Sequence, residues 1–149
     1  MPKPRIFLDT SALFAAVMST TGAARMLLKL GEAGSIALYV GPTVLQEANE
    51  VFHRKAADLL PLLAVLLDRA YVQTSGEADD AALACAGAVI EYGPDARVAA
   101  EALAAGADFM VTHDKAHLLH NPRIGDLPCR IGNPGDCLAW LREHFVSGM

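Results

Sequence analysis

The sequence predicts an α/β protein, a three-layer α/β/α sandwich with a mostly parallel central sheet, and three observations support this prediction. Short apolar runs typical of buried strands recur along the chain, and helical segments separate them. Strands separated by helices pair in parallel through crossover connections. Hydrophobic residues make up 53% of the chain but aromatic residues only 6%. This alanine-inflated composition favours helices packed closely on a sheet.

The expected strands are short and are bounded by turn residues. The first lies in the sequence RIFLD and ends at Asp9. The second, SIALYV, lies between Gly34 and the pair Gly41-Pro42. In full, strands are expected at residues 6–8, 35–40, 71–74, 108–112 and, more weakly, 129–131.

The expected helices fill the intervals between these strands. A first helix begins near Ala12 and is capped by Thr10 or Ser11. Pro42 suits the first turn of another helix, and Gly106 suits the position just after a helix end. The remaining helices are expected at residues 21–33, 43–55, 56–69, 79–90, 95–105 and 135–145, with a short helical turn at 115–119.

Length and composition narrow the class of protein. We expect the 149 residues to form a single domain, 1–149. A formal net charge of −5 argues against an extensive basic surface for nucleic acid. It is compatible with an acidic site whose cations bridge to phosphate. The three cysteines form no CxxC pair, there is no secretory signal, and the most apolar segment, residues 59–67, is too short to cross a bilayer. We therefore expect a cytoplasmic protein without a membrane partner.

Acidic residues recur at positions that the predicted topology brings to one edge of the sheet. They are Asp9 after the first strand, Glu47 on the helix after the second, Asp95 at the start of the helix after Pro94, and Asp114 after the fourth strand. In open α/β sheets, ligands bind beyond the carboxyl ends of the strands. Each acid alone could instead serve as a helix cap, a helix-terminal charge or a turn residue. Their coincidence at one edge favours a shared site.

The chemistry of such a cluster indicates a divalent cation. Clustered carboxylates raise one another's pKa values unless a cation compensates their charge. Hard oxygen ligands suit Mg²⁺ or Mn²⁺. A metal ion held there can activate water and stabilise the charge that develops on a phosphodiester. This chemistry needs no nucleophilic side chain, and none is obvious in the sequence.

Other chemistries fit less well. A phosphotransferase of the haloacid-dehalogenase type needs a second Asp two residues after the first, where this chain has Ser11. A receiver domain needs an acidic pair upstream of the first strand's Asp, which is absent. His113, His117 and His120 have a spacing that can place zinc ligands on one helical face. No Glu lies between the first two, so these histidines are interpreted as surface or substrate-side groups.

Three blocks of sequence surround the four acids. They are FLDTSALFAA around Asp9, PTVLQEANEV around Glu47, and PDARVAAEALAAGADFMVTHDKAHLL around Asp95 and Asp114. The last block is the most specific, because it joins an Asp that opens an alanine-rich helix to an apolar strand ending in Thr-x-Asp. In these blocks, over about residues 6–119, the chain resembles the PIN-domain nucleases, many of which are VapC-type toxins of toxin–antitoxin pairs.

The resemblance implies a PIN-like fold, Mg²⁺ or Mn²⁺ as cofactor, and endonucleolytic cleavage of single-stranded RNA. The four acids correspond to the metal-binding acids of the family. Thr112 and either Thr10 or Ser11 correspond to its supporting hydroxyls. Many toxin members carry a further Asp near the position of His117, and this chain lacks it.

The resemblance also implies a small antitoxin partner, which lays an apolar segment along exposed helices, and a homodimer. Residues 59–67, LLPLLAVLL, are apolar nearly all round, which predicts either a buried helix or a covered groove, with burial favoured.

Few basic residues are placed to hold RNA. Arg54 lies seven residues after Glu47, near the same helix face, and Lys115 directly follows Asp114. We predict that Arg54 or Lys115 contacts substrate phosphate, a solvated surface charge being the alternative.

Two other functions fit a PIN-like chain. One is a PIN-fold binding or regulatory protein without turnover, against which the four acids and Thr112 argue. The other is an RNA-processing nuclease that is not a toxin.

Overall fold

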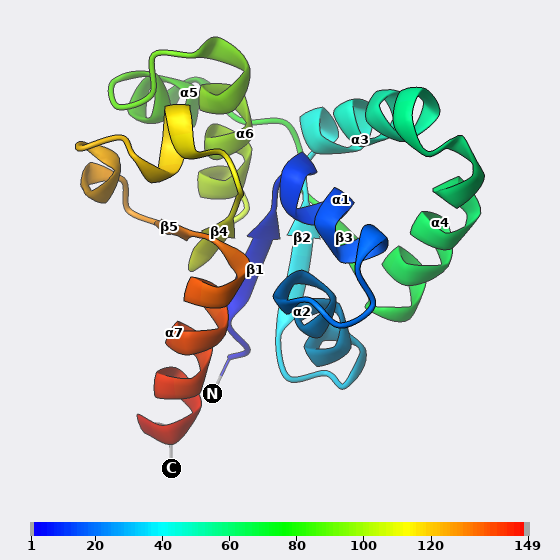
Figure 1. Ribbon diagram of the computed structural model, residues 1–149. Helices are drawn as coiled ribbons and strands as arrows, with labels where there is room; N and C mark the ends of the chain where they lie inside the picture. Colours follow the sequence, from blue (N-terminus) through cyan, green and yellow to red (C-terminus); the bar gives the residue numbers. More distant parts are fainter. Residues whose placement is uncertain (1, 148–149) are drawn as a thin grey trace.

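The computed structural model describes residues 2–147 and confirms the predicted fold class (Figure 1). A five-stranded sheet has the order β3-β2-β1-β4-β5, and every neighbouring pair is parallel. Ile6, Phe7 and Leu8 of the central strand are essentially inaccessible to solvent, as expected for a strand covered on both faces. The strands are β1 Arg5–Leu8, β2 Ala37–Val40, β3 Gln73–Thr74, β4 Phe109–Val111 and β5 Arg130–Gly132.

The helices form the two outer layers. Right-handed crossovers put the helices that link β1 to β2 to β3 on one face, and those that return the chain to β4 on the other. Accordingly, α1 packs with α2, α3 and α4, whereas α5 packs with α6, and α7 lies against β4, β5 and α2. The bounds are α1 Thr10–Met18, α2 Ala23–Glu32, α3 Pro42–Lys55, α4 Leu60–Arg69, α5 Asp80–Gly87, α6 Gly93–Ala104 and α7 Pro134–Ser147.

Several local signals act as predicted. Pro42 is the first residue of α3, where its missing N–H costs nothing. Gly106 follows α6 with a φ of 69°, the left-handed conformation that glycine adopts without steric cost. The predicted helical turn at residues 115–119 is a π-helical turn, Lys115–Leu119.

The start of α1 differs from the prediction that Thr10 or Ser11 is its cap. The N-cap is Asp9, whose Oδ1 accepts a hydrogen bond of 2.9 Å from the Ala12 N–H. The helix therefore begins at Thr10, because the carboxylate already satisfies an N–H of its first turn.

The elements around β3 and α6 also differ in length. β3 contains only two residues, because Tyr71, with a φ of 55°, completes the turn that follows α4. α6 begins at Gly93, so Asp95 lies in the first turn of the helix rather than at its start.

The apolar segment 59–67 is not buried as favoured above. In α4, Leu63 is buried, but Leu62 and Val65 are 37% and 45% exposed. The helix packs against α1, α2, α3 and the short helical turn Ala57–Leu59, which leaves Leu62 and Val65 exposed. The helix therefore carries more apolar side chains than are buried in the core of this chain.

No single helix of residues 2–147 is both long and apolar enough to cross a membrane, and only α1 and α2 taken together would qualify, although they are bent by 90°.

Candidate metal centre

The four acids predicted from the sequence line one cavity of about 330 Å³. Asp9 follows β1, Glu47 comes from α3, Asp95 from α6, and Asp114 from the loop after β4. The carboxyl ends of β1 and β4 meet there because these two strands are paired. The cavity therefore lies where a parallel sheet presents ligand-binding side chains.

Asp9 lies at the centre of a hydrogen-bond network and is only 8% exposed. Its Oδ1 accepts the Ala12 N–H and, at 2.7 Å, the Ser11 hydroxyl. Its Oδ2 accepts the Thr112 hydroxyl. Burial nevertheless outweighs these bonds and raises the pKa of Asp9 above its usual value. Thus Asp9 is held as a helix cap and still presents a carboxylate that gains from a nearby cation.

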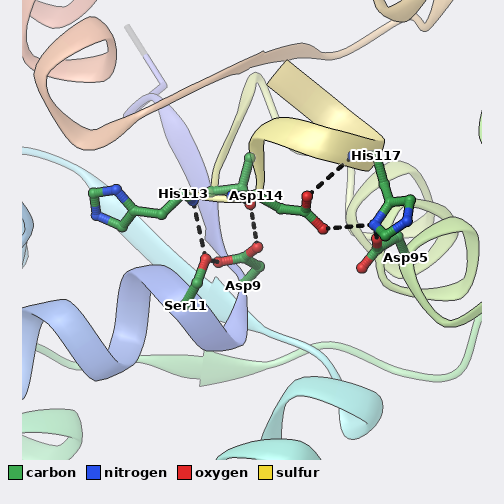
Figure 2. Close-up of polar contacts among 7 residues, drawn as sticks. Asp9, Ser11, Asp95, His113, Asp114 and His117 are labelled. Carbon is green, nitrogen blue, oxygen red and sulfur yellow. Dashed lines mark hydrogen bonds and ion pairs between the residues drawn. The ribbon is translucent and has the colours of Figure 1, made fainter. Parts of the chain in front are cut away.

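Two hydroxyls connect the end of β1 to the segment after β4. Ser11 Oγ accepts the His113 N–H at 2.9 Å, and Thr112 Oγ1 accepts the Asp114 N–H at 3.0 Å. Figure 2 shows the first of these bonds beside Asp9. Because both hydroxyls also donate to Asp9, the two acids Asp9 and Asp114 are held in a fixed relation.

Glu47 is held from the same helix that Asp9 caps. The Thr10 hydroxyl donates a hydrogen bond of 2.8 Å to Glu47 Oε2. Thr10 and Ser11, between which the sequence did not decide, thus have different partners: Thr10 orients Glu47, and Ser11 orients Asp9.

Asp95 and Asp114 face each other, and His117 lies between them (Figure 2). Burial and the nearby Asp114 carboxylate raise the pKa of Asp95 to about 7. Partial burial also acts to raise the pKa of Asp114, but hydrogen bonds from the His117 backbone and from neighbouring side chains lower it overall. The two carboxylates therefore cannot both ionise near neutral pH without a compensating positive charge.

The donor set suits a divalent cation. Asp95 Oδ2 is inaccessible to solvent and accepts no hydrogen bond from residues 2–147. An orphaned carboxylate oxygen beside three further acids is the arrangement that a hard cation stabilises. Asp95 and Asp114 present their carboxylates to such an ion, and Asp9 and Glu47 line the same cavity.

His117 is a functional candidate that the sequence reasoning treated as a surface or substrate-side group. Its Nδ1 lies 3.1 Å from Asp95 Oδ2 and 3.3 Å from Asp114 Oδ2. Within residues 2–147, Asp95, Asp114 and His117 form the group whose ligand atoms are close enough to share an ion. His113 and His120 do not join it, so the considered arrangement of three histidines is not formed.

Glu101 is a buried acid that the sequence reasoning missed. It is 3% exposed and lies on α6. Its carboxylate accepts the Thr43 N–H at 3.1 Å and the Thr43 hydroxyl at 2.5 Å. It therefore supplies the cap that Gly41, at the start of α3, lacks. This contact joins the helix of Asp95 to the helix of Glu47.

Lys55 brings a positive charge to the lining of the cavity. Arg54 and Lys115, the candidates from the sequence, are exposed and are not among the residues that line it. A 3.6-residue repeat puts position 54 near the face of Glu47, but position 55, at the last residue of α3, is the one that reaches the cavity.

The thermal stability of the metal-free protein is expected to fall as the pH rises from 5 to 8. The pKa of Asp95 is about 7 in the folded state and 3.8 ordinarily, so between these values the folded state binds more protons than the unfolded state. The lowered pKa of Asp114 acts below this window. Melting with a chelator present measures the effect, and Asp95→Asn should reduce the slope; the part that remains comes from Asp9, whose pKa is also raised by burial. An upward slope shared by both proteins would contradict this prediction.

The chain is similar to known proteins in sequence pattern and in fold. The family model described as the PIN domain matches residues 5–116. The structure of VapBC2 from Rickettsia felis bound to a promoter DNA fragment is similar with a TM-score of 0.62 and 16% identity, over 87% of this chain and 98% of that chain. VapC20 of Mycobacterium tuberculosis, a toxin that cleaves the sarcin–ricin loop, gives a TM-score of 0.47 and 17% identity, over 74% and 91%. No curated protein matches the chain. The family model spans most of the sequence and includes all four acids of the cavity, so the chain belongs to the PIN domain family.

Proposed function

We propose that this protein is a metal-dependent endoribonuclease that hydrolyses phosphodiester bonds of single-stranded RNA, with Mg²⁺ or Mn²⁺ as its cofactor. The observation that carries the proposal is the convergence of four carboxylates from separate segments on one cavity. The buried Oδ2 of Asp95, which accepts no hydrogen bond, and the raised pKa of that residue both favour a bound cation. Membership of the PIN domain family supports nuclease chemistry at this position.

The acids and the hydroxyls at the cavity then have separate roles. Asp9, Glu47, Asp95 and Asp114 hold the metal. A bound metal ion supplies the charge that activates water and stabilises the developing negative charge on phosphate. The hydroxyls act on the ligands: Thr112 and Ser11 fix Asp9, and Thr10 fixes Glu47.

The decisive experiment is a cleavage assay on mixed single-stranded RNA, with and without Mg²⁺ or Mn²⁺. We expect cleavage only with metal, and loss of cleavage in Asp9→Asn and in Asp95→Asn. Persistent RNA loss in both variants would show that the site is wrongly assigned. RNA binding without cleavage in the wild type, at any metal concentration, would instead favour a PIN-fold binding or regulatory protein.

We further propose that basic side chains bind the phosphates of the RNA. Lys55 lines the cavity. In the sequence, Arg54 directly precedes Lys55, and Lys115 directly follows Asp114. Lys55→Ala is expected to weaken RNA binding and to reduce the slope of log affinity against log salt by about 0.7, the value for one phosphate contact on a single strand. Filter binding at several salt concentrations measures this slope. An unchanged slope in Lys55→Ala, Arg54→Ala and Lys115→Ala alike would contradict phosphate binding by all three.

The biological setting that fits best is a cytoplasmic toxin neutralised by a small antitoxin. The sequence resembles VapC-type toxins, and the structure of VapBC2 is similar in fold. The exposed apolar face of α4, with Leu62 and Val65, offers a surface for an apolar antitoxin segment. A homodimer is proposed on the family resemblance.

Replacing Leu62 and Val65 together by Asp is expected to abolish neutralisation while leaving cleavage intact. The partner to use is the product of a short neighbouring reading frame, and the readouts are pull-down and RNA cleavage with that partner present. Lack of any such partner would favour an RNA-processing nuclease instead. Sedimentation of the wild type tests the dimer separately.

A further inference from the structure

We propose that His117 is a direct nitrogen ligand in a metal subsite formed with Asp95 and Asp114, and that this ligand makes the subsite prefer Mn²⁺ over Mg²⁺. The inference rests on the proposed function only in that a divalent cation occupies the acidic cavity. It concerns His117, which is not one of the four acids, and it adds a preference for Mn²⁺ over Mg²⁺ that four carboxylates alone do not give.

The first argument is the spacing of the three ligand atoms. His117 Nδ1 lies 3.1 Å from Asp95 Oδ2 and 3.3 Å from Asp114 Oδ2, and single ligand atoms of all three side chains lie within 4.8 Å of one another. In octahedral coordination with bonds of about 2.1 Å, adjacent ligands are about 3 Å apart. The distance from the nitrogen to each of the two oxygens is therefore close to the distance between adjacent ligands of one ion.

The second argument is that His117 cannot satisfy both carboxylates by hydrogen bonding. Its Nδ1 carries one hydrogen at most, and the hydrogen-bond geometry is met toward Asp114 Oδ2. Asp95 Oδ2 lies closer, yet it accepts no hydrogen bond. A cation bound by the nitrogen lone pair and by the two oxygens would satisfy all three atoms at once.

The third argument is that the imidazole ring is held in place before any ion binds. Tyr92 stacks on it with ring centroids 4.5 Å apart and planes inclined by 16°. The His117 N–H donates to Asp114 Oδ1, which fixes the start of the π-helical turn relative to that carboxylate. Figure 2 shows the ring between the carboxylates of Asp95 and Asp114. A ligand so oriented loses little conformational freedom on binding.

Selectivity follows from the ligand chemistry. Mg²⁺ prefers oxygen ligands and loses its water reluctantly. Mn²⁺ is the weakest binder of the first-row transition metals, but as a transition-metal ion it accepts an imidazole nitrogen more readily than Mg²⁺ does. An imidazole ligand therefore weakens Mg²⁺ binding relative to Mn²⁺ binding.

The experiment measures metal binding without RNA turnover. Metal-free protein is loaded with substoichiometric Mn²⁺, and pulsed electron paramagnetic resonance detects nitrogen coupled to the ion. We expect the coupling of one coordinated imidazole in the wild type, its replacement by the ¹⁵N pattern after ¹⁵N-histidine labelling, and its loss in His117→Ala. His120→Ala, three residues away and exposed, is the matched control and should retain the coupling.

Calorimetry on the same proteins tests selectivity. His117→Ala is expected to weaken Mn²⁺ binding by at least the roughly 10–100-fold that loss of a supporting metal-site residue causes, and to change Mg²⁺ binding less than threefold. Thermal melting checks that the variant folds. If it does not fold, the ¹⁵N-labelled wild-type protein still shows whether a histidine binds the ion. Retention of the nitrogen signal in His120→Ala and in His113→Ala then shows that neither of these residues is the ligand.

The outcomes separate this inference from the proposed function. Mn²⁺ that binds the wild type without nitrogen coupling, and is lost in Asp95→Asn, would overturn the role of His117 and leave the metal-dependent nuclease intact. Equal weakening of Mg²⁺ and Mn²⁺ in His117→Ala would also overturn the selectivity. Absence of any divalent-metal binding to the wild type would overturn both proposals.

Discussion

Asp9→Asn is expected to reduce RNA cleavage about a thousandfold while leaving the metal-free protein at least as stable as the wild type. A metal ion supplies several kcal/mol of transition-state stabilisation, and about 4 kcal/mol corresponds to about three powers of ten in rate. Asp9 is the most buried of the four acids in the cavity. Loss of its charge therefore weakens cation binding, and water has little access to this position to replace the lost ligand.

The stability result has the opposite sign because the Asp9 carboxylate is buried. Burial raises the pKa of Asp9, so its contribution to stability falls as the pH rises from the ordinary value of 3.8 through the folded value. Asparagine has the same shape, carries no charge, and can still accept the Ala12 N–H. The gain in stability should thus be seen at pH 8 and vanish at pH 4.

Single-turnover cleavage and thermal melting, each on the same preparation, measure the two effects. Asp68→Asn is a suitable control, because it removes an exposed carboxylate from α4, away from the cavity lining. A variant that melts well below the wild type at pH 8 would refute the electrostatic explanation. Full activity in Asp9→Asn would refute the assignment of Asp9 as a metal ligand.

Glu101→Ala is expected to destabilise the protein by about 3 kcal/mol or more, although Glu101 does not line the acidic cavity. It accepts two hydrogen bonds from Thr43, and a hydrogen bond to a charged group is worth about 1.5–3 kcal/mol. For a chain of this size, each kcal/mol shifts the melting temperature by about 2–4 °C. The expected drop in melting temperature is therefore about 6–12 °C.

Chemical denaturation, with a double-mutant cycle between Glu101→Gln and Thr43→Val, isolates the coupling of these two side chains. Gly41→Ala tests the same contact from the other side, because its Cβ would lie 2.1 Å from Glu101 Oε1. Glu50→Gln, an exposed acid on α3, is the control. A loss below about 1 kcal/mol in Glu101→Ala would show that water replaces the carboxylate as a cap.

Local patterns were sufficient to predict the fold class and the convergence of the four acids on one cavity. β1 is an apolar run that ends at a charge, and the position of such a charge at a sheet edge follows from parallel topology. The same holds for Asp114 after β4. Lys55 was missed, because a difference of one residue at the end of α3 decides which side chain reaches the cavity.

Tertiary contacts explain what the sequence did not reveal. His117 faces Asp95 only because α6 packs beside the loop that follows β4, and no spacing rule joins residues 22 positions apart. Glu101 had a detectable signal: α3 starts after Gly41, which has no capping side chain, so its cap had to come from elsewhere. The exposure of α4 depends on what packs against it, which hydrophobicity alone does not determine.

The hydroxyl hydrogen bonds between the end of β1 and the segment after β4 have a consequence for the synthesis of the protein. The bond between Ser11 and His113 joins residues 102 positions apart in the sequence, and the bond between Thr112 and Asp9 joins residues 103 positions apart. Such distant pairing closes late in folding, because the intervening chain must first be ordered. A nascent chain or a proteolytic fragment that ends before Thr112 lacks both Asp114 and the clamp on Asp9, so it should have no nuclease activity. On the proposed function, cleavage therefore requires a chain that extends past β4 to Asp114.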